Sequence, residues 1–387
     1  MTARRSRADT RAGSGATYHF PVMSTTAAPR WIVSPGFDLV CFFGGAALSV
    51  LFLGLYFALG VSIVALWWVW LLAFDGPHIG AAFTRTYLDA QEWRQRRRLL
   101  LVSLLTFVAG PLALLANELT GSQDPFLLFL GFATFYGYYH VVRQHWGFVA
   151  LYNAVNRDYT SMRLDKAALY IGCFAPYAYF LLTHPKARVL LHLPPRSTAL
   201  ETALEGLLIA VWGGALLWFA YVQFRGGGLR LRNPKTPYML VTVLLYGAIY
   251  FAVARYEPVY GASTGPDEDF LLLSIAIVIF HNVQYLGLVW FHNRNRYGEA
   301  SHHGAANVVN RTLYAYLAAC ALFSAAVYFT FACSTGVFPL CRWSASARWN
   351  QIGLCLWWGL AMNHYYLDQK IWRIRGDDAL KRALRLA

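Results

Sequence analysis

The chain has 387 residues, of which 57% are hydrophobic and 13% are charged. Soluble domains carry roughly 25% Asp, Glu, Lys and Arg, so this composition excludes an ordinary water-soluble globular protein. The formal net charge of +14 at pH 7 does not indicate nucleic-acid binding, because the Lys and Arg residues lie in short loops between apolar runs. Membrane topology explains the charge better.

The two ends of the chain differ in composition from the rest. Residues 1–30 are rich in Arg, Gly, Ser, Thr and Ala, and no apolar core of the signal-peptide type follows before Trp31. We predict a disordered cytoplasmic tail over 1–30, a single transmembrane helical domain over 31–375 and a cytoplasmic C-terminal tail over 376–387.

Apolar runs close to the roughly 18 to 20 residues that cross a bilayer recur along the chain. They predict an all-α polytopic membrane protein with about ten transmembrane helices. The predicted spans are 39–59, 63–84, 99–116, 125–152, 167–183, 203–224, 238–254, 270–292, 312–332 and 349–367.

Basic residues divide unevenly between the two sides of these spans. If the N-terminal tail is cytoplasmic, 26 Lys and Arg fall in cytoplasmic segments and 6 in outer loops, with Arg143 inside a span. The positive-inside rule therefore predicts that both termini are cytoplasmic, as in a multi-pass protein of a bacterial inner (plasma) membrane. Cys333 and Cys341 flank the last outer loop, where a disulfide forms only if that side is oxidising.

The histidines gather on the predicted cytoplasmic side. Three of the 11, His19, His184 and His192, are expected at the surface. Because successive helices run in opposite directions, random placement would scatter the other eight over both faces, yet all lie in the cytoplasmic halves of helices or in the loop after them. These eight are His78, His140, His145, His281, His292, His302, His303 and His364.

The second span ends in Asp75-Gly-Pro-His78 and is followed by Arg85 and Asp89. The spacing of three and four residues predicts one helical face that carries Asp75, His78, Arg85 and Asp89. Pro77 is expected to kink the helix just before His78. The alternative to a metal ligand is a histidine that is satisfied by a neighbouring carboxylate.

The fourth span carries His140 and His145 with Arg143 between them. Two side chains five residues apart on a regular helix point about 140° away from each other and are separated by about 7.5 Å along the axis. The two imidazoles can therefore bind one centre only if their side chains bend round the helix toward it. Two adjacent metals or a π-bulge would ease this geometry. A charged Arg143 is expected to face a polar interior or the interface.

The eighth span places His281, Gln284, Tyr285 and His292 on one face. His281 and His292 are separated by about 16 Å of helix rise, so they do not ligate one metal without a break in the helix. We expect His281 to be the buried ligand. His292 is either a ligand of a second centre or an interfacial residue.

The tenth span closes with Asn363-His364 and, one turn later, Asp368. A carboxylate at this spacing orients a ligating imidazole or joins it as a ligand. The alternative is an amphipathic helix end with an interfacial aromatic and basic belt, which explains Trp372 and Arg373 but not His364.

Several convergent histidines without a Cys-x-x-Cys motif suit iron, zinc or copper better than magnesium or calcium. We expect non-haem iron first, with zinc or copper as alternatives, because oxygen chemistry attacks the unactivated carbons and alkenes of lipids. The predicted metal ligands are His78, His140, His145, His281, His364 and His292. The predicted catalytic residues are Asp75, Asp368, Tyr285 and Asn363.

The H-x4-H spacing of His140 and His145 resembles the histidine box of membrane non-haem iron desaturases and hydroxylases. Those families add two H-x2-HH boxes, and this sequence has only the pair His302-His303. In its Gly-Pro-His78 segment, Asp89 and sparse single histidines, the chain looks more like the bacterial Brp/Blh carotenoid-cleaving dioxygenases. That resemblance implies an oxygen-dependent iron site acting on a polyene.

The sequence therefore predicts a metal-dependent oxygenase or desaturase of a lipid, fatty-acyl or isoprenoid substrate at the cytoplasmic face, with membrane lipids and an electron-transfer partner around it. One alternative is a lipid or acyl transferase with His364 as general base beside Asn363. Another is a transporter in which Asp75, His78, Arg143 and Asp368 relay protons or hold an anion.

Overall fold

The computed structural model describes residues 29–191, 193, 198–225, 231–255, 268–297, 302–334 and 347–386. Within these ranges the regular secondary structure is entirely helical, which confirms the predicted all-α class. The helices are α1 (Pro35–Asp38), α2 (Gly44–Phe57), α3 (Ile63–Trp70), α4 (Gly76–Arg85), α5 (Ala90–Ser103), α6 (Thr106–Thr120), α7 (Asp124–Asn156), α8 (Met162–Thr183), α9 (Pro185–Leu190), α10 (Thr198–Arg225), α12 (Lys235–Gly247), α14 (Glu268–Arg296), α15 (Ala305–Val309), α16 (Leu313–Ser334), α17 (Ala347–Ile371) and α18 (Asp378–Ala383). Short π-helical turns at Leu39–Phe43, Leu71–Asp75 and Ala248–Ala252, and a 3-10 turn at Val253–Arg255, extend α1, α3 and α12.

Seven helical segments among the described residues are long and apolar enough to cross a membrane. Length and composition thus make the chain a membrane-embedded protein. All ten predicted ranges fall on helices, but those at 167–183, 312–332 and 349–367 lie on α8, α16 and α17, outside the seven. The count of about ten spans and the cytoplasmic placement of both termini remain predictions.

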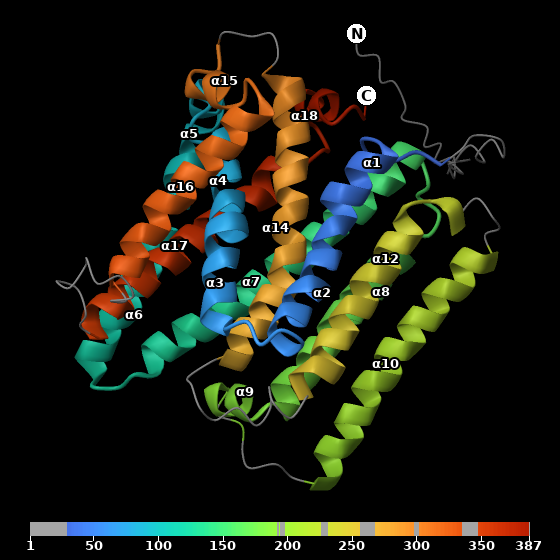
Figure 1. Cartoon of the computed structure of the whole chain (residues 1–387), viewed down its shortest axis with the longest axis vertical. Helices are drawn as coiled ribbons and strands as arrows, with labels where there is room; N and C mark the ends of the chain where they lie inside the picture. Colours follow the sequence, from blue (N-terminus) through green and yellow to red (C-terminus); the bar gives the residue numbers. More distant parts are fainter. Residues whose placement is uncertain are drawn as a thin grey trace, which may run out of the picture.

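Helix α14 forms the centre of the bundle (Figure 1). It packs against α2 on one side and α4 on another, and it also contacts α7. In its most apolar stretch, 78% of the residues are buried. In the corresponding stretch of α10, which packs on α8 at the edge of the molecule, 11% are buried. Residues that α14 carries are therefore enclosed by helices from distant parts of the sequence.

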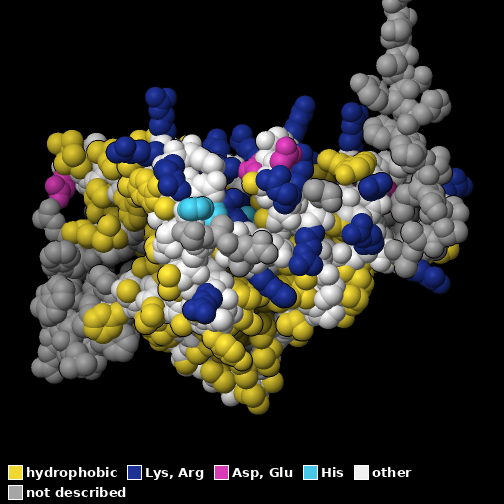
Figure 2. All heavy atoms as spheres, turned by 90° about the horizontal axis from the view of Figure 1, so that it is seen from above, with side chains coloured by type: hydrophobic (Ala, Val, Ile, Leu, Met, Phe, Trp, Pro, Cys, Tyr) yellow, Lys and Arg dark blue, Asp and Glu magenta, His cyan; other side chains and the backbone are white. Residues whose placement is uncertain are grey.

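One end of the bundle carries many basic side chains. Viewed from the end that carries α15 and α18, Lys and Arg side chains are spread over the face while acidic groups are few (Figure 2). This is the face that the positive-inside rule assigns to the cytoplasm.

The predicted irregularity at Pro77 is present as a π-helical turn over Leu71–Asp75, directly before α4. Proline lacks an N–H group and crowds the carbonyl four residues earlier, so a regular helix is not continued through it. The Ser324 hydroxyl of α16 donates to the Leu72 carbonyl oxygen at 3.0 Å, which satisfies one of the carbonyls in this turn. The irregular turn therefore ends three residues before His78, which lies in the first turn of α4.

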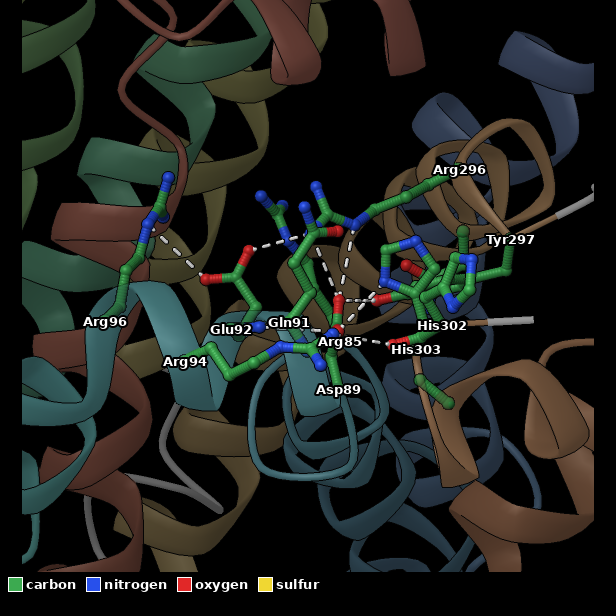
Figure 3. A network of polar contacts seen from close by, with 12 residues as sticks. Arg85, Asp89, Gln91, Glu92, Arg94, Arg96, Arg296, Tyr297, His302 and His303 are labelled. Carbon is green, nitrogen blue, oxygen red and sulfur yellow. Dashed lines mark hydrogen bonds and ion pairs between the residues drawn. The ribbon is translucent and has the colours of Figure 1, made fainter. Parts of the chain in front are cut away.

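Asp89 does not share a helical face with His78, as the sequence spacing suggested, because α4 ends at Arg85. Instead it caps α5, where its Oδ1 accepts from the Gln91 backbone N–H at 2.7 Å. Its carboxylate also binds Arg296 at 3.1 Å and His303 at 3.0 Å, in the network shown in Figure 3. These contacts tie α5 to the end of α14.

Burial by itself raises the pKa of Asp89, but the hydrogen bond with His303 and the charge of Arg296 outweigh it and bring the pKa below the usual 3.8. A carboxyl group whose pKa is depressed on folding stabilises the fold above its unfolded pKa. That contribution is lost only as the pH falls through the depressed value.

Four further expectations concern the ends and loops. The predicted tail over 1–30 lies almost wholly outside the described residues. The side chains of Cys333 and Cys341, between which a disulfide was considered, also lie outside the described part of the chain. His184, which was expected at the surface, is buried, so that expectation is wrong. No observation tests the division at residues 375 and 376.

Two glycines of α2 make a matched test of the packing. A Cβ on Gly45 would lie 2.7 Å from the Cα of Phe280 in α14, whereas Gly54 has nothing within 4 Å. Since backbone gives way poorly, Gly45→Ala is expected to destabilise the protein by about 1–3 kcal/mol. Gly54→Ala is expected to be stabilising by about 0.5–1 kcal/mol, because alanine favours the helix. Thermal unfolding in detergent measures both, and equal shifts would contradict the close packing of α2 on α14.

Candidate metal centre

Four imidazole rings meet in the interior of the bundle, one from each of four helices. They belong to His78 of α4, His140 of α7, His281 of α14 and His364 of α17. The ring centroid of His78 lies 5.1 Å from that of His281 and 4.6 Å from that of His364. The centroid of His140 lies 4.9 Å from that of His281 and 5.0 Å from that of His364. We call this closed group the four-histidine ring.

The four-histidine ring is buried: none of its members is more than 3% exposed. One nitrogen from each of His78, His281 and His364 can be chosen so that the three lie within 4.8 Å of one another. A second such group consists of His140, His364 and a carboxylate oxygen of Asp368. Because His364 belongs to both, the two groups form one site.

Several ring nitrogens lack a partner. Nε2 of His140, Nδ1 of His281 and Nδ1 of His364 are buried without a hydrogen-bond partner among the described residues. Buried polar atoms are nearly always paired, because each unpaired one costs on the order of 1–3 kcal/mol. Each of these three histidines therefore has a nitrogen that no described protein group satisfies, and neutral imidazole nitrogen is the commonest metal ligand in proteins.

His78 is held in one orientation by its surroundings. Its Nδ1 lies 2.6 Å from the backbone carbonyl oxygen of Asp75, a distance that places a proton between them. Nδ1 therefore donates its proton to this carbonyl. The other nitrogen, Nε2, keeps its lone pair and faces the other histidines, 3.0 Å from Nε2 of His364. A histidine ligand that donates its other N–H to a carbonyl is the usual arrangement at metal sites.

A polar shell lies behind His78. The hydroxyl of Tyr328 in α16 donates to the Asp75 carboxylate. Asn282 lies against the His78 ring, and its Oδ1 accepts from the indole N–H of Trp70 at 2.9 Å. Asp75 is thus a positioning residue for His78 rather than a member of the four-histidine ring.

Asp368 borders the four-histidine ring on the other side. Its Oδ2 lies 3.7 Å from Nε2 of His364 and 3.9 Å from Nε2 of His140. Its Oδ1 accepts from the Tyr285 hydroxyl at 2.6 Å, which orients the carboxylate. Asp368 is placed either to bind a metal directly or to orient the two imidazoles, and Tyr285 acts through Asp368.

Two predicted ligands lie elsewhere. His145 is buried, but its ring nitrogens pair with the hydroxyls of Tyr238 at 2.7 Å and Tyr246 at 3.0 Å. Helix α7 is regular, without the π-bulge that would have turned His145 toward His140. His292 lies near the end of α14, where Nδ1 contacts Asn293 Oδ1 at 2.8 Å, as the rise along the helix predicts.

Asn363 makes its hydrogen bond outside the four-histidine ring. Its amide nitrogen donates to the Tyr87 hydroxyl at 2.9 Å. It therefore joins α17 to the segment after α4, and the structure does not bring it to the ring with His364.

Sequence reasoning missed three residues of the site. Asn282 and Tyr328 support His78 and Asp75, and Tyr365 stacks on His140 with ring centroids 4.4 Å apart. The position of Asn282 directly after His281 was a signal for it. Nothing in the sequence distinguishes Tyr328 from the other tyrosines of apolar helices.

A cavity of about 340 Å³ leads away from the site. His140, Tyr285 and Asp368 line its inner end, and it lies between α7, α8, α14 and α17. Its volume is at the lower end of the roughly 300–1,000 Å³ that is usual for ligand sites.

The pairing of Tyr285 with Asp368 yields a direct prediction. Tyr285→Phe removes the donor to Oδ1, so the affinity for metal is expected to fall by about 10–100-fold, as for other supporting residues of metal sites. Competition with a chelator of known affinity measures the change. The matched control is Tyr316→Phe, whose hydroxyl donates to the Leu286 carbonyl at 3.0 Å, outside the four-histidine ring. An equal loss in both variants would contradict the role of Tyr285.

Comparisons of the chain with protein-family models, with curated proteins and with solved structures find no match. The functional argument therefore depends on the geometry of the site.

Proposed function

We propose that the protein is a membrane-embedded, metal-dependent oxidoreductase, an oxygenase or desaturase that uses non-haem iron. Its substrate would be a lipid, fatty-acyl or isoprenoid molecule, and the reaction would occur toward the cytoplasmic face of a bacterial inner membrane. The observation that carries the proposal is the four-histidine ring, with its unpartnered nitrogens and adjacent carboxylate.

The donor set fits iron. Imidazole nitrogen with carboxylate oxygen, and no thiolate nearby in the described residues, suits iron, zinc or copper. Bound iron would supply the activation of oxygen that unactivated carbons need. His78, His140, His281 and His364 would hold the metal, with Asp368 as a further ligand or as an orienting group.

The chain itself supplies enclosure and orientation. Burial of the four-histidine ring excludes bulk water, which protects reactive species from side reactions. Asp75 holds His78 through its backbone carbonyl, and Tyr285 holds Asp368. A desaturase or mono-oxygenase would also take two electrons from a redox partner, for which the basic face in Figure 2 would be the docking surface, whereas a dioxygenase would need none.

Metal analysis of the purified protein tests the proposal. We expect at least about one iron ion per chain, without the absorbance of haem, and loss of the ion in a strong chelator. Nitric oxide, used as an oxygen surrogate, should bind to the reduced anaerobic protein and change its electron paramagnetic resonance spectrum. A protein purified without any stoichiometric transition metal, and unable to take one up, would favour the metal-free transferase.

A further inference from the structure

The buried residues that line the cavity differ in chemistry from the exposed ones. The inner end meets the site at His140, Tyr285 and Asp368. Most of the other uncharged wall residues are apolar or aromatic, and two, Gln144 and Gln369, are polar. The apolar and aromatic ones are Trp146, Gly147, Phe148, Ala150, Leu151, Tyr170, Leu288, Trp372, Ile374 and Leu384.

Three basic side chains surround the other end. Arg143 of α7, Lys166 of α8 and Arg373, two residues beyond α17, all line the cavity and are exposed. The Lys166 ammonium lies 5.9 Å from the ring centroid of Trp146 and 5.6 Å from that of Tyr170, and these aromatic contacts hold it at the wall.

Acidic groups do not cancel this charge. Of the residues that line the cavity, Asp368 is the one acid, and it lies at the inner end with its Oδ1 bound to Tyr285. Arg143 and Arg373 donate to neutral oxygens, the Tyr139 hydroxyl at 3.1 Å and the Gln369 carbonyl at 2.9 Å. The mouth thus presents a net positive charge at the entrance to an apolar passage.

We propose that the cavity binds a single-chain amphiphile with an anionic head group, a carboxylate or a phosphate. The head group binds Arg143, Lys166 and Arg373, and the apolar chain extends inward to the four-histidine ring. This inference deepens the proposed function and depends on it for identifying the bound molecule as the substrate.

The position of Arg143 adds a detail to the substrate. Arg143 is three residues from His140 on one regular helix, a rise of about 4.5 Å. A head group bound at Arg143 is therefore held about one turn of α7 from the backbone position of His140.

Equilibrium binding to the purified full-length protein, kept anaerobic so that nothing is oxidised, tests the proposal. The probes are hexadecanoate, hexadecyl phosphate and hexadecanol in uncharged detergent. We expect at least one of the anions to bind at least tenfold more tightly than the alcohol, with an advantage that shrinks at high salt. Preference for one anion identifies the head group as a carboxylate or as a phosphate.

Variants separate this site from general attraction to a basic surface. The triple variant Arg143→Gln, Lys166→Gln and Arg373→Gln is expected to lose the anion preference. Arg163→Gln with Arg375→Gln, which removes exposed charges outside the cavity wall, is expected to keep it. The charge-preserving triple variant Arg143→Lys, Lys166→Arg and Arg373→Lys should retain the preference and excludes misfolding as the cause.

Equal binding of the alcohol and both anions would overturn the proposal, as would an equal loss in the control double variant. Iron measured on the same preparations separates the two conclusions. Iron without anion preference overturns only the substrate assignment. Anion preference in a protein that cannot bind metal supports the binding site and overturns the oxidoreductase.

Discussion

Metal content is expected to fall from about one ion per chain to less than about a tenth of that in His281→Ala and in His140→Ala, a loss in affinity of at least roughly 80-fold. Each change removes one imidazole of the four-histidine ring, and the remaining ligands are fixed to helices that do not move inward to replace it. Elemental analysis after size-exclusion chromatography measures the content.

The matched controls are histidines on the same two helices. His292→Ala on α14 and His145→Ala on α7 are expected to retain the metal, because their side chains pair outside the four-histidine ring. His145→Ala should lower stability, since it removes the imidazole that pairs with the hydroxyls of Tyr238 and Tyr246, although Tyr238 keeps its contact with Gln284. Metal loss in both members of a pair would mean that the ring is not the ligand set.

Lys235→Met is expected to destabilise the protein by about 3–5 kcal/mol. The Lys235 ammonium is fully buried at the start of α12 and binds Asp158 at 3.1 Å, Ser161 at 3.1 Å and Asp165 at 2.9 Å. Its removal leaves two carboxylates in the interior without the charge that compensates them, and this costs more than the lost contacts alone. Thermal unfolding in detergent, with folded yield as a second readout, measures the effect.

Two further variants test the cause. Lys381→Met removes a pair with Asp378 of nearly the same length, 2.8 Å, but at an exposed site where solvent screens the charges, so little stability is lost. Neutralising the partners as well, with Asp158→Asn and Asp165→Asn, should recover part of the stability of Lys235→Met. A loss in Lys235→Met no larger than that in Lys381→Met would contradict the burial argument.

Local periodicity in the sequence was enough to predict the helices and part of the site. The apolar runs predicted ten helical ranges, and all ten fall on helices. The helix rise from His281 to His292 correctly separated the two residues, and the one-turn spacing of His364 and Asp368 correctly brought them together. These inferences depend only on residues of one helix, whose relative positions are set by backbone geometry.

The choice between His140 and His145 could not be made in this way. The sequence placed them about 140° apart and kept both as predicted ligands, through a π-bulge or a second metal; which of them faces the centre depends on the neighbours of α7. Helix α17 brings His364 to His140, while α12 brings Tyr238 and Tyr246 to His145. Asp89 was misplaced for a related reason, because its partners Arg296 and His303 come from more than 200 residues away.

The sequence by itself therefore determined the membrane character of the chain, its helices and the single-helix spacing of its histidines. Only the tertiary structure decided that four imidazoles close into a ring, that Asn282 and Tyr328 support it and that a cavity leads from it to Arg143, Lys166 and Arg373. The physical reason is that a helix determines the direction of each side chain relative to its own axis, whereas packing between distant helices determines which faces meet.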